Sequence, residues 1–292
     1  MANKTVGVVG LGNMGSGMAQ SLLRNGFKVV GADVGSVQKD NARSLGITVV
    51  DTLKAVCQET DIIILSLPMA KHVQEVIVGD QGLLKYAQSS SLVVDTSTSE
   101  PDVTRTLAAK MSEAGHSMLD CPVSGGPAGA KSGTMVMLVG GETTDLNRAE
   151  PVLKALTSKI VHLGASGNGH VGKLINNLLC ASHLLTTAEA MSLANNAGLS
   201  QAALAEALNA GSGRSAISEI NYPKWILNEA FDSGFSMQLM RKDLRLAMDL
   251  VGKMGVDTPL SKQAAAIWHS SESEIADNED FNRIVSIVGE KS

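Results

Sequence analysis

The chain has 292 residues, which at about 150 residues per domain predicts two domains, and its 24 basic and 29 acidic side chains leave a formal charge of −5. This acidic balance offers little to nucleic acid or to an anionic membrane surface, and an apolar fraction of 44% with 18% charged residues excludes a disordered chain. Because no apolar run could cross a bilayer and the three cysteines are scattered, we expect a soluble, cytoplasmic α/β protein without disulfides.

Short β-branched runs alternate with helical patterns in the first half of the chain. The predicted strands are Thr5–Val9, Lys28–Ala32, Ile62–Leu67, Leu92–Asp95, Met118–Asp120, Thr134–Val139 and Ile160–Leu163. The predicted helices between them are Met14–Arg24, Val37–Leu45, Ala70–Val78, Pro101–Ala114 and Thr144–Thr157. Because several strands are apolar on both faces, this order predicts a doubly wound, mostly parallel sheet of the Rossmann type over residues 1–164.

The chain changes character after Gly164, where helical periodicity replaces the β-branched runs. Apolar residues recur at helical spacing from Val171 to Ala197, and Gly198 just beyond them predicts a glycine-capped end to one long helix. Further helices are predicted at Gln201–Asn209, Met237–Met254 and Pro259–Ser271. We therefore expect residues 165–292 to form an all-helical domain with the long helix as its spine.

A glycine-rich loop is the first chemical signal. Gly10-Leu11-Gly12-Asn13-Met14-Gly15 follows a predicted strand and opens a predicted helix, which is the context of a dinucleotide-binding loop. The first glycine permits a tight turn, the second lets a pyrophosphate approach the backbone, and the third lets helix and strand pack closely. Amides at the start of the helix would bind the phosphates. A plain strand–turn–helix without a ligand is the alternative.

Asp33 bears on which dinucleotide is bound. It ends the second predicted strand, about 20 residues after the glycine loop, where a carboxylate accepts hydrogen bonds from the ribose hydroxyls. The same carboxylate would repel a 2′-phosphate, and no Lys or Arg follows until Lys39. We therefore expect NAD rather than NADP.

Three further segments lie at predicted strand ends, where doubly wound sheets bind their ligands. Leu67-Pro68-Met69 and Asp95-Thr96-Ser97-Thr98 could contact cofactor or substrate, although each taken singly fits an ordinary loop better. Ser124-Gly125-Gly126 offers a hydroxyl and unobstructed amides that can hold a carboxylate, or it is a glycine-rich turn without a ligand. Cys121 is expected to be a packed thiol, because no basic neighbour activates it.

Lys173 is the second chemical signal. It lies in an early turn of the long predicted helix, and Asn176 and Asn177 project from the same face because residues three and four apart share a helix face. A helical lysine is normally a solvated surface group. At the junction of a cofactor domain and a helical domain, partial burial and a nicotinamide cation would favour its neutral form, which can act as a general base. His170 is either a rival acid–base group or a structural hydrogen-bonding residue.

The last candidates lie toward the carboxyl terminus. Phe235, Lys242 and Asp243 lie on or beside an amphipathic helix, whose solvated side would equally explain the two charged residues. The loop Ser212-Gly213-Arg214-Ser215 could bring a guanidinium to an anionic substrate. The six histidines do not pair at ligand spacing, so no metal site is expected.

Four ordered motifs together resemble those of the β-hydroxyacid dehydrogenases, above all the 3-hydroxyisobutyrate type. The motifs are Val9–Gly15, Asp95–Thr98, Asp120–Gly126 and Gly167–Asn177, followed by Lys242-Asp243, and the resemblance extends over essentially the whole chain. The resemblance implies that Lys173 is the catalytic lysine. It also implies substrate binding by Ser124, Gly125, Gly126 and Asn177, an active site lined by Phe235 and Asp243, and cofactor contacts by Thr98 and Lys242.

The expected NAD site combines these contacts with those inferred from the loops. Its residues are Gly10, Leu11, Gly12, Asn13, Met14, Gly15, Asp33, Pro68, Met69, Thr98 and Lys242. Two positions depart from the commoner family pattern. Met69 stands where many relatives carry Asn, which leaves the polar contacts of that loop open, and Cys121 stands where many carry Ala.

The resemblance also implies the reaction. Hydride would pass between NAD and the alcohol carbon of a small 3-hydroxyacid while Lys173 exchanges the hydroxyl proton, and the chain would form a homodimer or homotetramer. A substrate of the 3-hydroxyisobutyrate type is favoured. Alternatives within the family are tartronate semialdehyde (2-hydroxy-3-oxopropionate) reductase, threonate dehydrogenase, succinic semialdehyde or glyoxylate reductase, and sulfonated-aldehyde reductase. A non-catalytic dinucleotide-binding sensor is the alternative of another class, and the lysine argues against it.

Overall fold

The computed structural model describes residues 4–88 and 90–288, so the extreme ends of the two predicted domains, residues 1–3 and 289–292, lie outside the described part. The chain divides into two compact units, residues 1–173 (the first unit) and residues 174–292 (the helical unit). The division falls within the long helix α9 (Asn168–Asn196), and each unit is described by itself.

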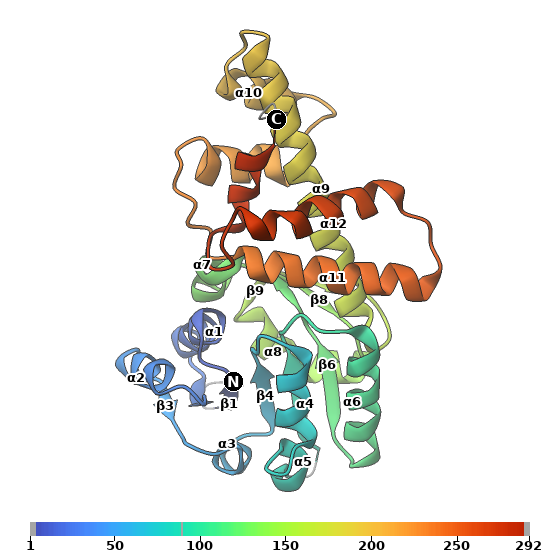
Figure 1. Cartoon of the computed structure of the whole chain (residues 1–292). Helices are drawn as coiled ribbons and strands as arrows, with labels where there is room; N and C mark the ends of the chain where they lie inside the picture. Colours follow the sequence, from blue (N-terminus) through green and yellow to red (C-terminus); the bar gives the residue numbers. More distant parts are fainter. Residues whose placement is uncertain (1–3, 89, 289–292) are drawn as a thin grey trace. The chain divides into compact units, whose positions relative to one another are not determined.

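A six-stranded parallel sheet forms the centre of the first unit, in the order β3-β2-β1-β4-β5-β6 (Figure 1). The strands are β1 (Thr5–Val9), β2 (Lys28–Ala32), β3 (Thr48–Val49), β4 (Ile62–Leu65), β5 (Leu92–Asp95) and β6 (Ser117–Asp120). The strand order reverses between β1 and β4, which is the switch point at which doubly wound sheets bind dinucleotides. The predicted Rossmann-type sheet is confirmed.

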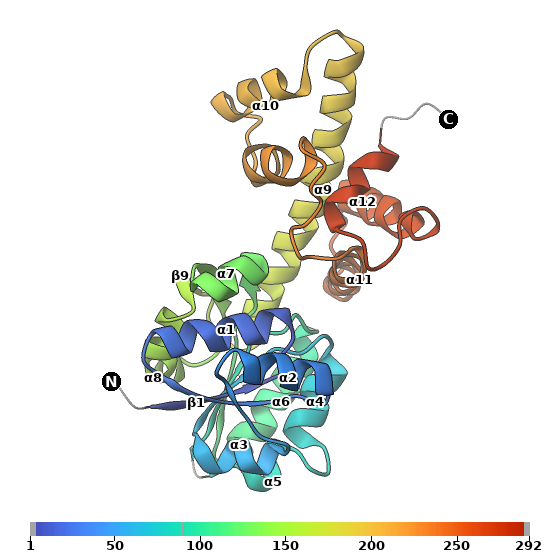
Figure 2. The same cartoon turned by 90° about the vertical axis from the view of Figure 1, so that its left-hand side faces the viewer.

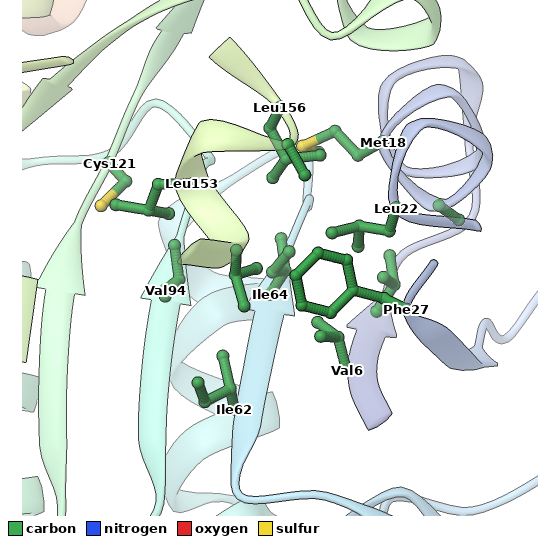
Figure 3. Packing of buried hydrophobic residues seen from close by; sticks show 14 of the residues in the cluster. Val6, Met18, Leu22, Phe27, Ile62, Ile64, Val94, Cys121, Leu153 and Leu156 are labelled. Atoms are coloured by element: carbon green, nitrogen blue, oxygen red, sulfur yellow. The ribbon is translucent and has the colours of Figure 1, made fainter. Parts of the chain in front are cut away.

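Helices cover both faces of this sheet, as Figure 2 shows for α1 and α8 on one side and α3 and α5 on the other. The helices are α1 (Asn13–Arg24), α2 (Ser36–Ser44), α3 (Leu53–Glu59), α4 (Ala70–Val78), α5 (Leu83–Tyr86), α6 (Pro101–Glu113), α7 (Gly126–Ser132) and α8 (Thr143–Lys154). Side chains of β4 alternate between two cores, because successive strand residues point to opposite faces. Ile62 and Ile64 pack with Leu22 of α1 (Figure 3), whereas Ile63 and Leu65 face α3, α4 and α6.

The last two predicted strands of the first half lie in a separate three-stranded sheet, in the order β7-β8-β9. Its strands are β7 (Val123–Ser124), β8 (Met135–Val139) and β9 (Thr157–His162). β7 runs antiparallel to β8, and β8 runs parallel to β9. The short α7 follows β7 and ends at Ser132, and its C-cap residue Gly133 has a φ of 76°, the left-handed conformation that suits glycine. Neither β7 nor α7 is among the elements predicted from the sequence.

The helical unit contains the greater part of α9 and every element after it. These elements are α10 (Gln201–Ala210), the π-helix η1 (Ile217–Ile226), α11 (Met237–Met254), α12 (Pro259–Ser270) and the short 3₁₀ helices η2 (Ser271–Ser273) and η3 (Phe281–Ile287). Trp268 is fully buried, and its indole N–H donates to the Ala181 carbonyl of α9 at 3.2 Å. Gly198 has a φ of 81° just beyond α9, which confirms the predicted glycine cap. No helix in the described part of the chain is both long and apolar enough to cross a membrane.

Candidate active site

The three glycines of the loop after β1 differ in what surrounds them. Gly10 has a φ of 91°, and a Cβ there would lie 2.2 Å from the Ser66 carbonyl oxygen. A Cβ at Gly15 would lie 1.8 Å from the Gly10 carbonyl oxygen, so both positions require glycine for the turn and for close packing. Gly12 is exposed, and a Cβ there would have no neighbour within 4 Å. Its backbone faces open space that a pyrophosphate can approach, so the loop fits a dinucleotide.

Helix α1 begins directly after this glycine and has no side-chain cap. Its N-cap residue is Gly12, which has no side chain to accept a hydrogen bond from the first turn. Asn13 is exposed and Met14 is half-buried. The first amides of an α-helix have no partner within the helix, so those of α1 can bind phosphate oxygens.

Asp33 supports the glycine loop as well as standing where a ribose is expected. Its Oδ2 accepts the Leu11 N–H at 2.6 Å, and its Oδ1 accepts the Gly35 N–H at 2.7 Å. A carboxylate offers about four lone-pair positions, so two remain for ribose hydroxyls. Asp33 therefore holds the loop and the start of α2 while it retains the capacity to bind a nucleotide.

The loops after β4 and β5 are tied to each other. Ser97 Oγ accepts the Leu67 N–H at 3.0 Å, and the Ser97 N–H donates to Asp95 Oδ1 at 3.0 Å. Of the residues predicted to contact NAD, Pro68 and Met69 are exposed on the first loop and Thr98 is half-buried on the second. The link through Ser97 holds these two loops together at the ends of neighbouring strands.

Met69 occupies the N-cap position of α4 and makes no side-chain hydrogen bond to the helix. An asparagine at an N-cap accepts a hydrogen bond from an amide of the first turn, which the Met side chain cannot do. Because Met69 stands where many relatives carry Asn, the start of α4 lacks a side-chain cap.

Lys173 and Ser124 meet in the first unit. The Lys173 ammonium nitrogen Nζ donates to Ser124 Oγ at 2.9 Å, and the residue is only 7% exposed. Ser124 ends β7, and the next two residues have positive φ values, 128° at Gly125 and 61° at Gly126. These two glycines let the chain turn sharply after Ser124, so that α7 begins immediately beyond the hydroxyl that Lys173 contacts.

His170 is enclosed within the first unit. Its ring is fully buried, Nε2 lies 2.9 Å from the Ser97 carbonyl oxygen, and Nδ1 lies 2.8 Å from Thr104 Oγ1. Because a carbonyl can only accept, Nε2 carries a hydrogen. With both ring nitrogens engaged, the geometry favours the structural interpretation of His170 over a role as the acid–base group.

Cys121 is buried beside two acidic residues. Burial raises the pKa of the Cys121 thiol well above its usual range, and the neighbouring Asp120 and Asp95 raise it further. Burial also raises the pKa of Cys57 to about 11. A thiol in this state is a poor nucleophile, in agreement with the predicted packing role.

Alkylation of the native protein is expected to spare Cys57 and Cys121. At pH 8 both thiols remain protonated and inaccessible, so iodoacetamide should modify them on the order of 10²-fold more slowly than in urea, where both become exposed thiols. Mass spectrometry of timed samples measures the three cysteines separately, and half-buried Cys180 serves as the internal comparison. Rapid labelling of Cys121 in the folded protein would make it an accessible nucleophile after all.

A second group of polar side chains lies in the helical unit. Asn177 Nδ2 donates to Asp243 Oδ2 at 2.6 Å, and Asn176 Nδ2 donates to Asn177 Oδ1 at 3.0 Å. The Lys242 ammonium lies 3.1 Å from Asp243 Oδ1, and the Asp243 side chain is 2% exposed. The structure therefore brings together three predicted site residues, Asn177, Lys242 and Asp243, that the sequence places on two different helices.

Two other candidate residues of the helical unit, Phe235 and Arg214, have different surroundings. Phe235 packs edge-to-face against Phe281, with ring centroids 5.3 Å apart. Its chain position is just before Ser236, whose hydroxyl caps α11 by accepting the Leu239 N–H. Arg214 is exposed on the loop between α10 and η1.

Comparison with known proteins relates the chain to dehydrogenases over almost its whole length. Residues 5–164 match the family described as the NAD binding domain of 6-phosphogluconate dehydrogenase, and residues 167–288 match the family described as the NAD-binding domain of NADP-dependent 3-hydroxyisobutyrate dehydrogenase. The chain is 34% identical over 298 residues to the mitochondrial 3-hydroxyisobutyrate dehydrogenase of Mus musculus, covering 100% of this chain and 89% of that protein. It is 35% identical over 272 residues to the NAD-dependent L-serine dehydrogenase of Pseudomonas aeruginosa, covering 91% of each.

A solved structure agrees with these sequence matches. The 3-hydroxyisobutyrate dehydrogenase of Mycobacterium tuberculosis with L-serine has a TM-score of 0.90 and 34% identity, covering 98% of this chain and 99% of that chain. Both family matches, the full-length relatives and this structure point in one direction. The chain therefore belongs to the 3-hydroxyisobutyrate dehydrogenase family of β-hydroxyacid dehydrogenases, and it is an NAD(P)-dependent dehydrogenase that acts on a CH–OH group.

Proposed function

We propose that this protein is an NAD-dependent dehydrogenase for a 3-hydroxyacid of the 3-hydroxyisobutyrate type, with Lys173 as its general acid–base. The contact of the buried Lys173 amine with the Ser124 hydroxyl, at 2.9 Å, is the observation that carries the proposal. A general base must lie within hydrogen-bond reach of the proton it takes, and this amine already reaches a hydroxyl oxygen. The relatives named for 3-hydroxyisobutyrate and L-serine support the substrate class, because both compounds carry a primary alcohol β to a carboxylate.

The proposed mechanism divides the work among the predicted residues. Ser124, Gly125 and Gly126 offer a hydroxyl and unobstructed amides for the substrate carboxylate. Neutral Lys173 takes the proton of the alcohol, and in the reverse direction its ammonium returns a proton to the aldehyde oxygen. NAD, when bound, supplies the acceptor for the hydride that leaves the alcohol carbon, so that the alcohol becomes a semialdehyde.

The remaining predicted residues would hold the reactants in place. We propose that Asn177, Asp243 and Phe235 orient and enclose the substrate. The dinucleotide would be held by Gly10, Leu11, Gly12, Asn13, Met14, Gly15, Asp33, Pro68, Met69, Thr98 and Lys242. In this assignment residues 1–164 form the NAD domain, and residues 165–292 contribute to substrate binding and to contacts between subunits.

Turnover of a substrate panel tests the proposal. NADH formation is measured at fixed NAD with 3-hydroxyisobutyrate, glycerate, threonate, 4-hydroxybutyrate, L-serine and dihydroxypropanesulfonate, with NADP as the cofactor control. Strong turnover of 3-hydroxyisobutyrate supports the proposal. Strong turnover of a single different compound would assign the protein to another substrate within the family. Tight NADH binding without turnover of any compound would instead favour a non-catalytic dinucleotide sensor.

Replacing Asp33 by asparagine is expected to lower the preference for NAD over NADP about tenfold, which corresponds to about 1.4 kcal/mol. The substitution removes the charge that opposes a 2′-phosphate but keeps the size of the side chain that holds Leu11. The ratio of kcat/KM for the two cofactors measures the effect. Asp40→Asn, on exposed α2, is the matched control. An unchanged ratio in Asp33→Asn would mean that Asp33 serves the loop alone.

We further propose that the protein is a cytoplasmic homodimer or homotetramer. Large apolar side chains are exposed along α9, with Ile175 at 50%, Leu179 at 51% and Leu193 at 72% exposure. Exposed apolar surface on one long helix favours association through that helix. Light scattering of the purified protein gives its mass, and a monomeric mass would contradict the proposal.

A further inference from the structure

Asp120 lies outside the proposed NAD and substrate contacts, yet its carboxylate binds the start of α9. The residue ends β6 and is completely buried. Its Oδ1 accepts the Gly167 N–H at 2.8 Å, and its Oδ2 accepts the His170 N–H at 3.0 Å. These amides belong to the beginning of a helix that starts at Asn168, where backbone N–H groups have no partner within the helix. A carboxylate from a distant strand therefore acts as the cap of α9.

Two glycines make room for this carboxylate. A Cβ at Gly140 would lie 2.5 Å from Asp120 Oδ1, and a Cβ at Gly169 would lie 2.8 Å from Asp120 Oδ2. Gly140 and Asp120 also exchange both backbone hydrogen bonds, with N···O distances of 3.1 Å and 2.8 Å. Pairing with Gly140 next to β8 thus fixes the Asp120 backbone, and the two amides at the start of α9 hold its carboxylate.

Lys173 and Ser124 each lie a few residues along the chain from one side of this cap. Lys173 follows His170 by three residues in α9, so it projects from the same helix face one turn later. Ser124 follows Asp120 by four residues in the chain, and its Oγ accepts the hydrogen bond of Lys173 Nζ at 2.9 Å. Any rotation or shift of the first turn of α9 would therefore change the distance between amine and hydroxyl.

We propose that Asp120 is a positioning residue for Lys173: by capping α9 it fixes the rotation and depth of the first turn and thereby holds the amine at Ser124. This inference rests on the proposed function, in which Lys173 is the general acid–base. Asp95, the register partner of Asp120 on β5, does not share the role, because its Oδ1 binds the Ser97 N–H rather than an amide of α9.

A double-mutant cycle tests the proposal. Asp120→Asn keeps the size of the side chain and one acceptor oxygen, but it turns an amide N–H toward a backbone N–H. With 3-hydroxyisobutyrate and L-serine as substrates, kcat is expected to fall on the order of 10²-fold, because a misplacement of about 1 Å has an effect of that size. KM for NAD is expected to stay within about twofold. In the Lys173→Ala background, Asp120→Asn should cause no further loss, since Asp120 acts through the lysine.

Hydrogen exchange gives a readout that does not depend on turnover. Amides of residues 167–173 should exchange faster in Asp120→Asn, whereas those of the middle of α9 should keep the wild-type rate. Ser200→Ala is the matched control, because it removes the side-chain cap of α10, where Ser200 Oγ accepts the Ala203 N–H at 3.3 Å. It should lower the melting temperature without changing kcat. Should Asp120→Asn melt too low for assay, the same cycle is run with Asp120→Ser, which keeps one oxygen at the cap.

The outcomes distinguish a failure of the positioning role of Asp120 from a failure of the proposed catalytic role of Lys173. Equal losses of kcat from Asp120→Asn in the wild-type and Lys173→Ala backgrounds would overturn the positioning role, as would a normal kcat in Asp120→Asn when Lys173→Ala is inactive. If Lys173→Ala keeps its rate, the proposed function itself fails, and the positioning role loses its premise.

Discussion

Replacing Lys173 by alanine is expected to lower kcat for hydroxyacid oxidation by about 10²- to 10⁴-fold, the range that general acid–base catalysis contributes. The lost amine is the one that contacts Ser124 Oγ at 2.9 Å from a residue only 7% exposed, so bulk water does not readily replace it. Affinity for NADH should stay within about twofold, because the glycine loop and Asp33 are proposed to hold the dinucleotide. Initial rates of NADH formation and a fluorescence titration with NADH measure the two effects.

Two further variants separate proton transfer from charge. Lys173→Arg keeps a cation but cannot release a proton near neutral pH, so it should be almost as slow as the alanine variant. Lys110→Ala removes an exposed helical lysine of α6 and should leave kcat unchanged. An alanine variant at residue 173 that retains more than about a tenth of kcat would remove Lys173 from the mechanism.

Replacing Arg241 by methionine is expected to destabilise the helical unit by about 3 kcal/mol. The Arg241 side chain is 4% exposed, and its guanidinium donates to Ser271 Oγ at 2.8 Å, to the Ile275 carbonyl at 2.9 Å and to Asp277 Oδ1 at 2.8 Å. Methionine fills a similar volume but leaves these acceptors without a donor. Breaking a buried ion pair costs about 3–5 kcal/mol. The lower end of this range applies because Asp277 is 58% exposed, so its carboxylate remains hydrated when Arg241 is removed.

Tryptophan fluorescence reports this loss selectively. The chain has two tryptophans, Trp225 and Trp268, and both lie in the helical unit. Urea unfolding followed through their emission should show a lower midpoint for Arg241→Met with an unchanged slope. Arg245→Met, one turn further along α11 and exposed, should change stability by no more than about 0.5 kcal/mol. Equal midpoints for the two variants would contradict the expected role of Arg241.

The parallel sheet could be predicted because its strands carry local information. Thr5–Val9, Lys28–Ala32 and Leu92–Asp95 have the predicted bounds, since short apolar runs between turn residues are a local pattern. The long helix could be predicted for the same reason. Its observed span, Asn168–Asn196, begins three residues before the predicted periodic stretch and ends one residue before its predicted end.

Other elements depend on partners that are distant in the sequence. Strand β9 begins at Thr157, three residues before its predicted start, because pairing with β8 extends it beyond the apolar run. The two-residue strand β7 exists only through its pairing with β8. The π-helix η1 contains Pro223, and a proline in a short apolar segment indicates a break rather than a helix.

The candidate site shows the same limit. Sequence motifs name Lys173 and Ser124 separately, but their hydrogen bond joins residues 49 positions apart. The cap that Asp120 places on α9 spans 47 positions and has no local signature, because an aspartate at a strand end is common. Asn177 and Asp243, 66 positions apart, likewise become partners only when α9 and α11 pack. Residue types at a site can thus be inferred from the chain, whereas their contacts come from the fold.

The central place of β1 in the sheet has a consequence for folding kinetics. Its neighbours in the sheet are β2 and β4, and it pairs with β4 only after more than fifty intervening residues have been brought into a closed loop. The tight turn at Gly10 packs against the Ser66 carbonyl, at the end of β4. Because long-range pairings form slowly compared with local helical contacts, the glycine loop gains its full support late in folding.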